Sequence, residues 1–157
     1  MDIFSNFPLW AALISIGLAQ FIKIPLHFFA TKRFDWSLLT STGGMPSSHS
    51  GAVTALATAI GLEQGFETPY FAIAAIFGVI VMFDASGVRR HAGEQATVIN
   101  RLVEDFNKIV KEAKNWPEKK EQEKRQELKE LLGHEPIEVF FGGLLGIIIA
   151  LILHTVF

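Results

Sequence analysis

Three short clusters of polar residues lie at or near the ends of the chain's apolar segments, and their residue types suit phosphate chemistry. The first cluster, residues 43–50, places Ser47, Ser48 and His49 directly after a proline. Proline and serine are typical of the first turn of a helix, whose free backbone N–H groups attract an anion. Serine hydroxyls add donors, and His49 can exchange a proton near neutral pH. The cluster therefore predicts either an anion site or only a capped helix with an exposed histidine.

The second cluster, residues 84–91, contains the adjacent arginines Arg89 and Arg90. A guanidinium group can bind two phosphate oxygens at once, which suits arginine to phosphate recognition. Paired arginines at the end of a membrane-spanning helix are also common topology anchors, and the cluster alone favours that interpretation. Lys23, within an apolar stretch, either reaches the membrane interface or completes an anion pocket.

The third cluster, residues 133–138, contains His134 and Glu138, which are four residues apart. On a helix this spacing places both side chains on one face. A carboxylate that accepts one imidazole N–H fixes the tautomer and makes the other ring nitrogen a better nucleophile. The alternative is that His134 and Glu138 are two ligands of a metal ion.

The elements that must position these clusters are apolar segments of membrane-spanning length. Of the 157 residues, 50% are hydrophobic, 19% are charged and none is cysteine, which excludes a disordered chain, a disulfide scaffold and a cysteine-based zinc site. The net charge of −2 gives no general attraction to nucleic acid, so no nucleic-acid partner is expected. An all-α integral membrane bundle of about four transmembrane helices is predicted from four apolar segments, at residues 7–30, 46–62, 69–85 and 137–157. A soluble protein with buried helices is the less favoured alternative.

Charged residues are concentrated between the third and fourth apolar segments. Nine of the 14 Lys and Arg residues lie at positions 101–129, and nine of the 16 acidic residues lie at positions 94–130. We therefore predict a single domain, residues 1–157, with residues 94–132 as a polar helical insertion. The positive-inside rule makes this insertion cytoplasmic and both termini external, because the basic residues near the span ends share its side of the membrane: Lys32, Arg33, Arg89 and Arg90.

The insertion itself is predicted to form two helices. Apolar residues recur through residues 99–113 at the spacing of a one-sided helical stripe, and Pro117 ends that pattern. Residues 118–132 are rich in Glu and Lys. This surface either contacts anionic lipid headgroups or belongs to a solvated helical hairpin that packs on itself.

In their order along the chain, these clusters resemble the type-2 phosphatidic acid phosphatase superfamily. The resemblance is closest to its divergent branch of short bacterial and plastid membrane proteins, which are related to acid phosphatases and vanadium-dependent haloperoxidases. The family's second motif, Pro-Ser-Gly-His, matches residues 46–49, with Ser48 in place of glycine. In its third motif a histidine is followed four residues later by aspartate, which matches His134 and Glu138 with glutamate as the carboxylate.

Two departures from the family pattern concern the cations. The arginine of the third motif is expected about six residues before the histidine. Here the equivalent is Arg90, or else Arg89, which lies far upstream of His134, as if residues 94–132 had been inserted between them. The first motif is a lysine with Arg-Pro seven residues later. Lys23 fits the lysine, but position 30 is alanine, so Arg33 or Arg89 would have to supply the missing guanidinium.

The resemblance implies a membrane lipid phosphate phosphatase that forms a phosphohistidine intermediate. His134 would attack phosphorus and Glu138 would orient it, while His49 would protonate the leaving alkoxide and later activate water. The phosphate would be held by Lys23, Ser47, Ser48, Arg89 and Arg90. The family's mechanism uses no metal and no other cofactor.

The substrate class implied is a lipid phosphate of the inner leaflet of a bacterial plasma membrane or its equivalent: phosphatidylglycerol phosphate, phosphatidate, or a prenyl phosphate or diphosphate. Two alternatives are a small transporter or channel subunit, with Lys23, Asp84 and Glu138 along an ion path, and a catalytically inactive membrane scaffold. Glycines in the last apolar segment also suggest a homodimer.

Overall fold

Helices make up all the regular structure of the described part of the chain. The computed structural model describes residues 3–34, 36–40, 43–113 and 133–156. Within these ranges lie two short 3-10 helices and five α-helices: η1 (Ile3–Ser5), α1 (Phe7–Thr31), η2 (Trp36–Thr40), α2 (Ser48–Gln64), α3 (Pro69–Ser86), α4 (Val88–Ala113) and α5 (Pro136–His154). The all-α prediction is therefore confirmed for these residues.

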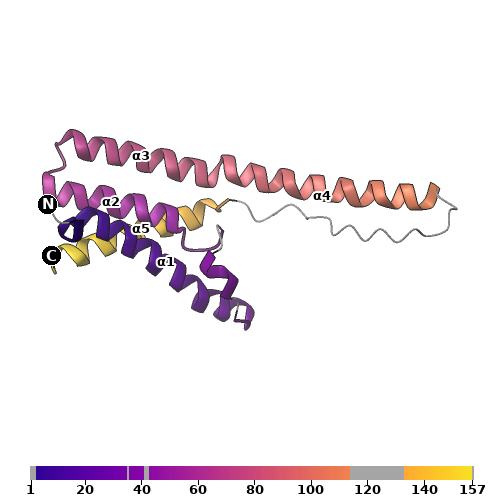
Figure 1. Ribbon diagram of the computed structural model, residues 1–157, viewed down its shortest axis with the longest axis horizontal. Helices are drawn as coiled ribbons and strands as arrows, with labels where there is room; N and C mark the ends of the chain where they lie inside the picture. Colours follow the sequence, from indigo (N-terminus) through magenta and orange to yellow (C-terminus); the bar gives the residue numbers. More distant parts are fainter. Residues whose placement is uncertain (1–2, 35, 41–42, 114–132, 157) are drawn as a thin grey trace.

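Helix α2 lies at the centre of the bundle and packs against α1, α3 and α5 (Figure 1). Helices α1 and α3 run away from the end of the bundle that carries both chain termini, and α2 and α5 run back toward it (Figure 1). The last turns of α1 and α3 and the first turns of α2 and α5 consequently lie at the same end, which we call the site end. All three polar clusters of the sequence are located there.

Small residues allow α2 and α5 to approach closely. A side chain added at Gly142 would collide with the backbone of Ser47, and one at Gly146 would collide with the carbonyl oxygen of Gly51. The Thr54 Oγ1 atom also lies 2.9 Å from the carbonyl oxygen of Gly143. Close backbone approach and interhelical polar contacts are the usual means of packing helices in a membrane, where the hydrophobic effect between helices is absent.

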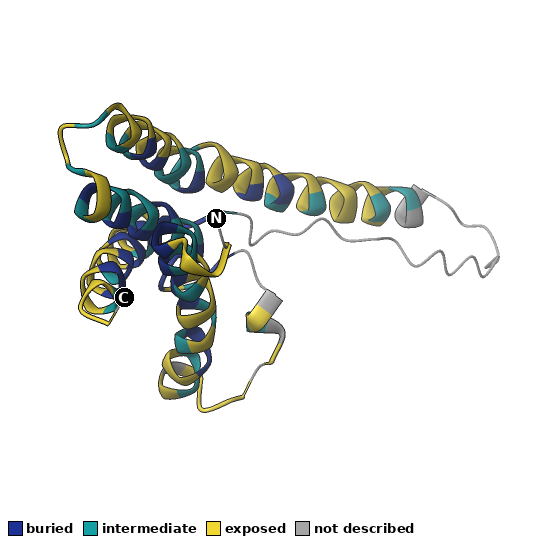
Figure 2. Ribbon diagram, turned by 60° about the vertical axis from the view of Figure 1, so that its left-hand side comes forward, coloured by how far each residue is buried: buried dark blue, intermediate teal, exposed yellow. Residues whose placement is uncertain are grey.

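Among the described residues, three helical stretches are long and apolar enough to cross a membrane: Phe7–Phe29, Pro69–Val110 and Pro136–His154. The outer face of α3 exposes large apolar side chains, among them Ile73, Phe77 and Ile80, as expected for a lipid-facing surface (Figure 2). Helix α2 is 17 residues long and is largely buried or half-buried between its neighbours. The spans predicted from the first, third and fourth apolar segments thus have matching helices, and the crossing by the second segment stays a prediction.

Helix α4 projects from the site end as a continuation of α3, from which only Gly87 separates it (Figure 1). It begins at Val88, before the boundary at residue 94 that the charge distribution indicates. The amphipathic pattern predicted over residues 99–113 lies within this helix, and its apolar side chains are exposed at Ile99, Leu102 and Phe106. The second helix predicted in the insertion, residues 118–132, lies outside the described residues.

Candidate functional site

His134 lies immediately before α5 and is buried, with 2% of its surface exposed. Its Nδ1 atom is 2.9 Å from Oε2 of Glu138, one helical turn later. The same oxygen accepts the backbone N–H of Glu135 at 3.2 Å, so Glu138 caps the helix start as well as orienting the ring. In the neutral form of the ring, Nδ1 donates its hydrogen to the Glu138 carboxylate, and Nε2 then carries the lone pair. Nε2 is buried and has no hydrogen-bond partner among the described residues.

The segment that enters α5 is fixed to the junction between α3 and α4. The backbone N–H of His134 donates to the carbonyl oxygen of Ala85 at 2.9 Å. Gly133 has a φ of +100°, and a side chain there would collide with the backbone of Arg89 and Arg90. The second and third polar clusters, although remote in sequence, are therefore in direct contact.

His49 reaches the same place from the first turn of α2. Ser47 caps this helix, because its Oγ accepts the backbone N–H of Ser50 at 3.3 Å and the Ser50 hydroxyl at 3.0 Å. The backbone N–H of Ser47 donates to the carbonyl oxygen of Glu138 at 3.0 Å, which ties the start of α2 to the start of α5. The ring centroids of His49 and His134 are 6.0 Å apart, with the ring planes inclined by 64°.

Lys23 is the buried cation of the site, with 2% of its surface exposed. Its Nζ donates to the carbonyl oxygen of Gly43 at 3.0 Å, in the loop that leads into α2. The ammonium group also interacts electrostatically with Glu138 and with His49. Lys23, which by sequence matches the lysine of the family's first motif, thus lies close enough to Glu138 and His49 for its charge to act on both.

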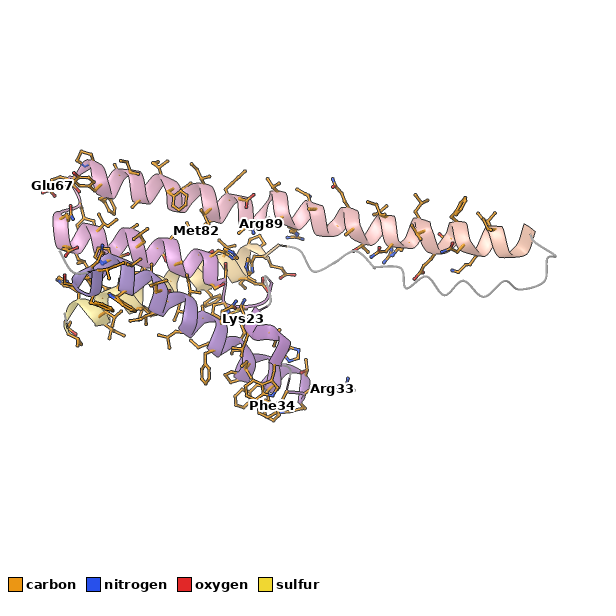
Figure 3. All side chains as sticks on the ribbon, viewed as in Figure 1. Lys23, Arg33, Phe34, Glu67, Met82 and Arg89 are labelled. Atoms are coloured by element: carbon orange, nitrogen blue, oxygen red, sulfur yellow. The ribbon has the colours of Figure 1, made fainter. Side chains whose placement is uncertain are left out.

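The two arginines are directed differently. Arg89 Nε lies 2.6 Å from Oδ2 of Asp84, and the Arg89 charge acts on His49. Arg90 Nε lies 3.1 Å from Oε1 of Glu94, one turn further along α4. The structure therefore favours Arg89 over Arg90 as the guanidinium near the histidines. In Figure 3, Lys23 and Arg89 lie near the starts of α2 and α5, whereas Arg33 lies further out, beyond the last turn of α1.

The sequence interpretation missed two parts of this arrangement. The sequence assigns Asp84 only to the alternative ion path, whereas the structure shows it as the partner of Arg89. The Ala85 carbonyl group that holds the backbone of His134 has no signal in the sequence at all. Among the described residues, no group of three or more His, Asp or Glu side chains is arranged to hold a metal ion.

Residues 4–149 match the sequence pattern of the divergent PAP2 family, named after the type-2 phosphatidic acid phosphatases. The chain belongs to this family. One relative, "Uncharacterized membrane protein YuiD" of Bacillus subtilis (strain 168), is 62% identical over 153 residues, which cover 98% of this chain and 97% of that protein. No solved structure matches the chain. The family resemblance expected from the motifs is confirmed, and the apolar helices together with this relative identify a membrane protein.

Proposed function

We propose that this divergent PAP2 protein is a membrane lipid phosphate phosphatase that forms a phosphohistidine at His134. The observation that carries the proposal is the state of His134: Nδ1 is held by Glu138, and Nε2 is buried, unpartnered among the described residues and close to a second imidazole. An imidazole oriented in this way is an activated nucleophile with its proton donor nearby. Membership of a PAP2-type family supports the same chemistry.

In the first step, the Nε2 lone pair of His134 attacks phosphorus, and the bond from phosphorus to the leaving oxygen breaks. His49, in its protonated form, gives its proton to that oxygen, so the lipid leaves as a neutral alcohol. When the leaving group is a phosphate, as in a diphosphate substrate, the same proton goes to the phosphate oxygen. The Glu138 carboxylate stabilises the positive charge that develops on the His134 ring.

In the second step, His49 takes a proton from a water molecule whose oxygen attacks phosphorus. The bond between phosphorus and Nε2 breaks, and its electron pair returns to His134. One water is consumed, inorganic phosphate is released, and both histidines recover their starting protonation states.

Cations around the histidines would hold the non-bridging phosphate oxygens and stabilise their charge. We assign this role to Lys23 and Arg89, with the buried serines Ser47 and Ser48 at the start of α2. Arg90, which pairs with Glu94, is left outside the proposed site.

The positive-inside rule supports a cytoplasmic orientation for the site, with both termini outside. A site at the cytoplasmic membrane surface suits a phosphate whose acyl or prenyl chain stays in the bilayer, such as phosphatidylglycerol phosphate, phosphatidate or a prenyl phosphate.

The proposal is tested by measuring phosphate release from a panel of these lipid phosphates by the purified protein in lipid nanodiscs. We expect turnover that vanadate inhibits and that His134→Ala and His49→Ala each abolish. His154→Ala, at the opposite end of α5, is the matched control and should retain activity. Turnover that survives His134→Ala would rule out the nucleophile. Ion flux through reconstituted vesicles without phosphate release would support the transporter alternative.

A further inference from the structure

Asp84 and Arg89 form an ion pair across the junction between α3 and α4. The two residues are five positions apart, whereas side chains on a regular α-helix meet at spacings of three or four. The contact exists because the helix is interrupted at Gly87, which has φ −107° and ψ −88°. A side chain at Gly87 would lie 2.9 Å from the carbonyl oxygen of Phe83. This junction therefore directs Arg89 back over the last turn of α3.

The ion pair occupies only one edge of the guanidinium group. Asp84 accepts the Nε–H of Arg89, and no other described residue takes a hydrogen bond from that side chain. A guanidinium has five N–H donors, four of which are on the two terminal nitrogens. Those four donors form the fork that matches two oxygens of a phosphate.

Two observations relate the pair to the two histidines of the proposed site. The charges of Asp84 and Arg89 both act on His49. The residue next to Asp84, Ala85, holds the backbone of His134 through its carbonyl oxygen at 2.9 Å. The last turn of α3 consequently sets the positions of the nucleophile's backbone and of the guanidinium together.

A contribution to stability does not account for this pair. The side chains of Arg89 and Asp84 are 50% and 37% exposed, and ion pairs at such exposed positions add little to folding stability. The neighbouring pair of Arg90 and Glu94 is similarly exposed, at 46% and 56%, and lies further along α4. It is therefore a natural control for the first pair.

We propose that Asp84 is a positioning residue, which holds Arg89 by Nε so that its terminal nitrogens face the phosphate bound at His134. The identity of the bound anion rests on the proposed function. Without the carboxylate, the long arginine side chain must be ordered each time the anion binds, and that ordering weakens binding.

The test combines binding of inorganic phosphate, followed by 31P NMR line broadening in nanodiscs, with lipid phosphate turnover. The variants are Asp84→Asn, Asp84→Ala, Asp84→Glu, Arg89→Ala, the double variant of Asp84→Ala with Arg89→Ala, and the control Glu94→Gln. We expect Asp84→Ala and Asp84→Asn to weaken phosphate binding about tenfold and to raise KM more than they lower kcat. Asp84→Glu should restore part of the loss, and Glu94→Gln should bind as the unmodified protein does.

The double variant separates positioning from other roles of Asp84. If Asp84 acts through Arg89, removing it from the Arg89→Ala protein has no further effect. The inference would be overturned if removing Asp84 weakened phosphate binding equally in the unmodified protein and in the Arg89→Ala protein. It would also be overturned if Asp84→Asn bound phosphate as tightly as Glu94→Gln does. Either result leaves the proposed function intact. Phosphate binding without turnover of lipid phosphates would instead refute the proposed function. The comparison of phosphate binding by the single and double variants would then still decide the role of Asp84. A folded protein that neither binds phosphate nor turns over lipid phosphates would refute both.

Discussion

The hydrogen bond between His134 and Glu138 makes the replacement Glu138→Gln a sensitive test of the proposed chemistry. Glutamine has nearly the same shape, and its amide oxygen can still accept the backbone N–H of Glu135 and the Nδ1–H of His134. What the replacement removes is the negative charge beside a ring that becomes positive when Nε2 is phosphorylated. The start of α5 should therefore remain folded while the chemical step slows.

The size of the effect follows from the burial of the pair. The side chains of His134 and Glu138 are 1% and 17% exposed, so water screens their interaction only weakly. A hydrogen bond to a charged group contributes about 1.5–3 kcal/mol, which corresponds to roughly a 10- to 150-fold loss in kcat. KM should change little, because the charge stabilises the phosphorylated ring more than the bound substrate.

The assay is steady-state phosphate release, with thermal unfolding measured on the same preparations. Glu135→Gln is the matched control, because Glu135 is exposed and its backbone N–H, which bonds Glu138, is unchanged. We expect the control to retain the kcat of the unmodified protein. The assigned role of the carboxylate would be refuted if the kcat of Glu138→Gln lay within twofold of that of the unmodified protein. It would also be refuted if unfolding of the variant accounted for its whole loss of activity.

Three further predictions concern packing, the buried cation and membrane orientation. Gly142→Ala should destabilise the bundle by about 1–3 kcal/mol and lower activity, because the added methyl group meets the backbone at the start of α2. The control is Gly17→Ala, because no atom lies within 4 Å of the added methyl group, and it should leave stability unchanged or raise it. Both variants are measured by thermal unfolding, and a similar loss of stability in both would contradict the packing argument. Lys23→Met should raise KM and weaken vanadate inhibition at least tenfold, because it removes a charge-assisted contact to the anion. Unchanged inhibition would exclude this lysine from the phosphate site. Because the chain has no cysteine, single cysteines at positions 67 and 104 can be labelled with a membrane-impermeant maleimide in intact cells. Labelling of Glu67→Cys alone is expected, and labelling of Glu104→Cys before permeabilisation would reverse the proposed orientation.

Much of this protein could be predicted from local sequence patterns. The apolar segments at residues 7–30, 69–85 and 137–157 correspond closely to α1, α3 and α5. They are predictable because a helix that crosses a bilayer must be apolar and long enough to span its hydrocarbon core. The spacing of four residues also predicts the contact of His134 with Glu138, although His134 lies before α5 and Glu138 reaches back to it from the first turn of the helix. The meeting of the polar clusters at one end also follows, because consecutive apolar segments of the bundle run in opposite directions.

Only the tertiary structure distinguishes Arg89, whose charge acts on His49, from Arg90, which pairs with Glu94. Neighbouring arginines are equivalent in composition and charge, and their directions depend on the backbone angles at Gly87, where α3 stops. Asp84 could not be recognised as a partner of Arg89 for the same reason, since a spacing of five is unfavourable on an unbroken helix. The close approach of Gly133 to Arg89 and Arg90 joins segments separated by the whole polar insertion. Such contacts depend on how complete helices pack, and no local periodicity of the chain encodes them.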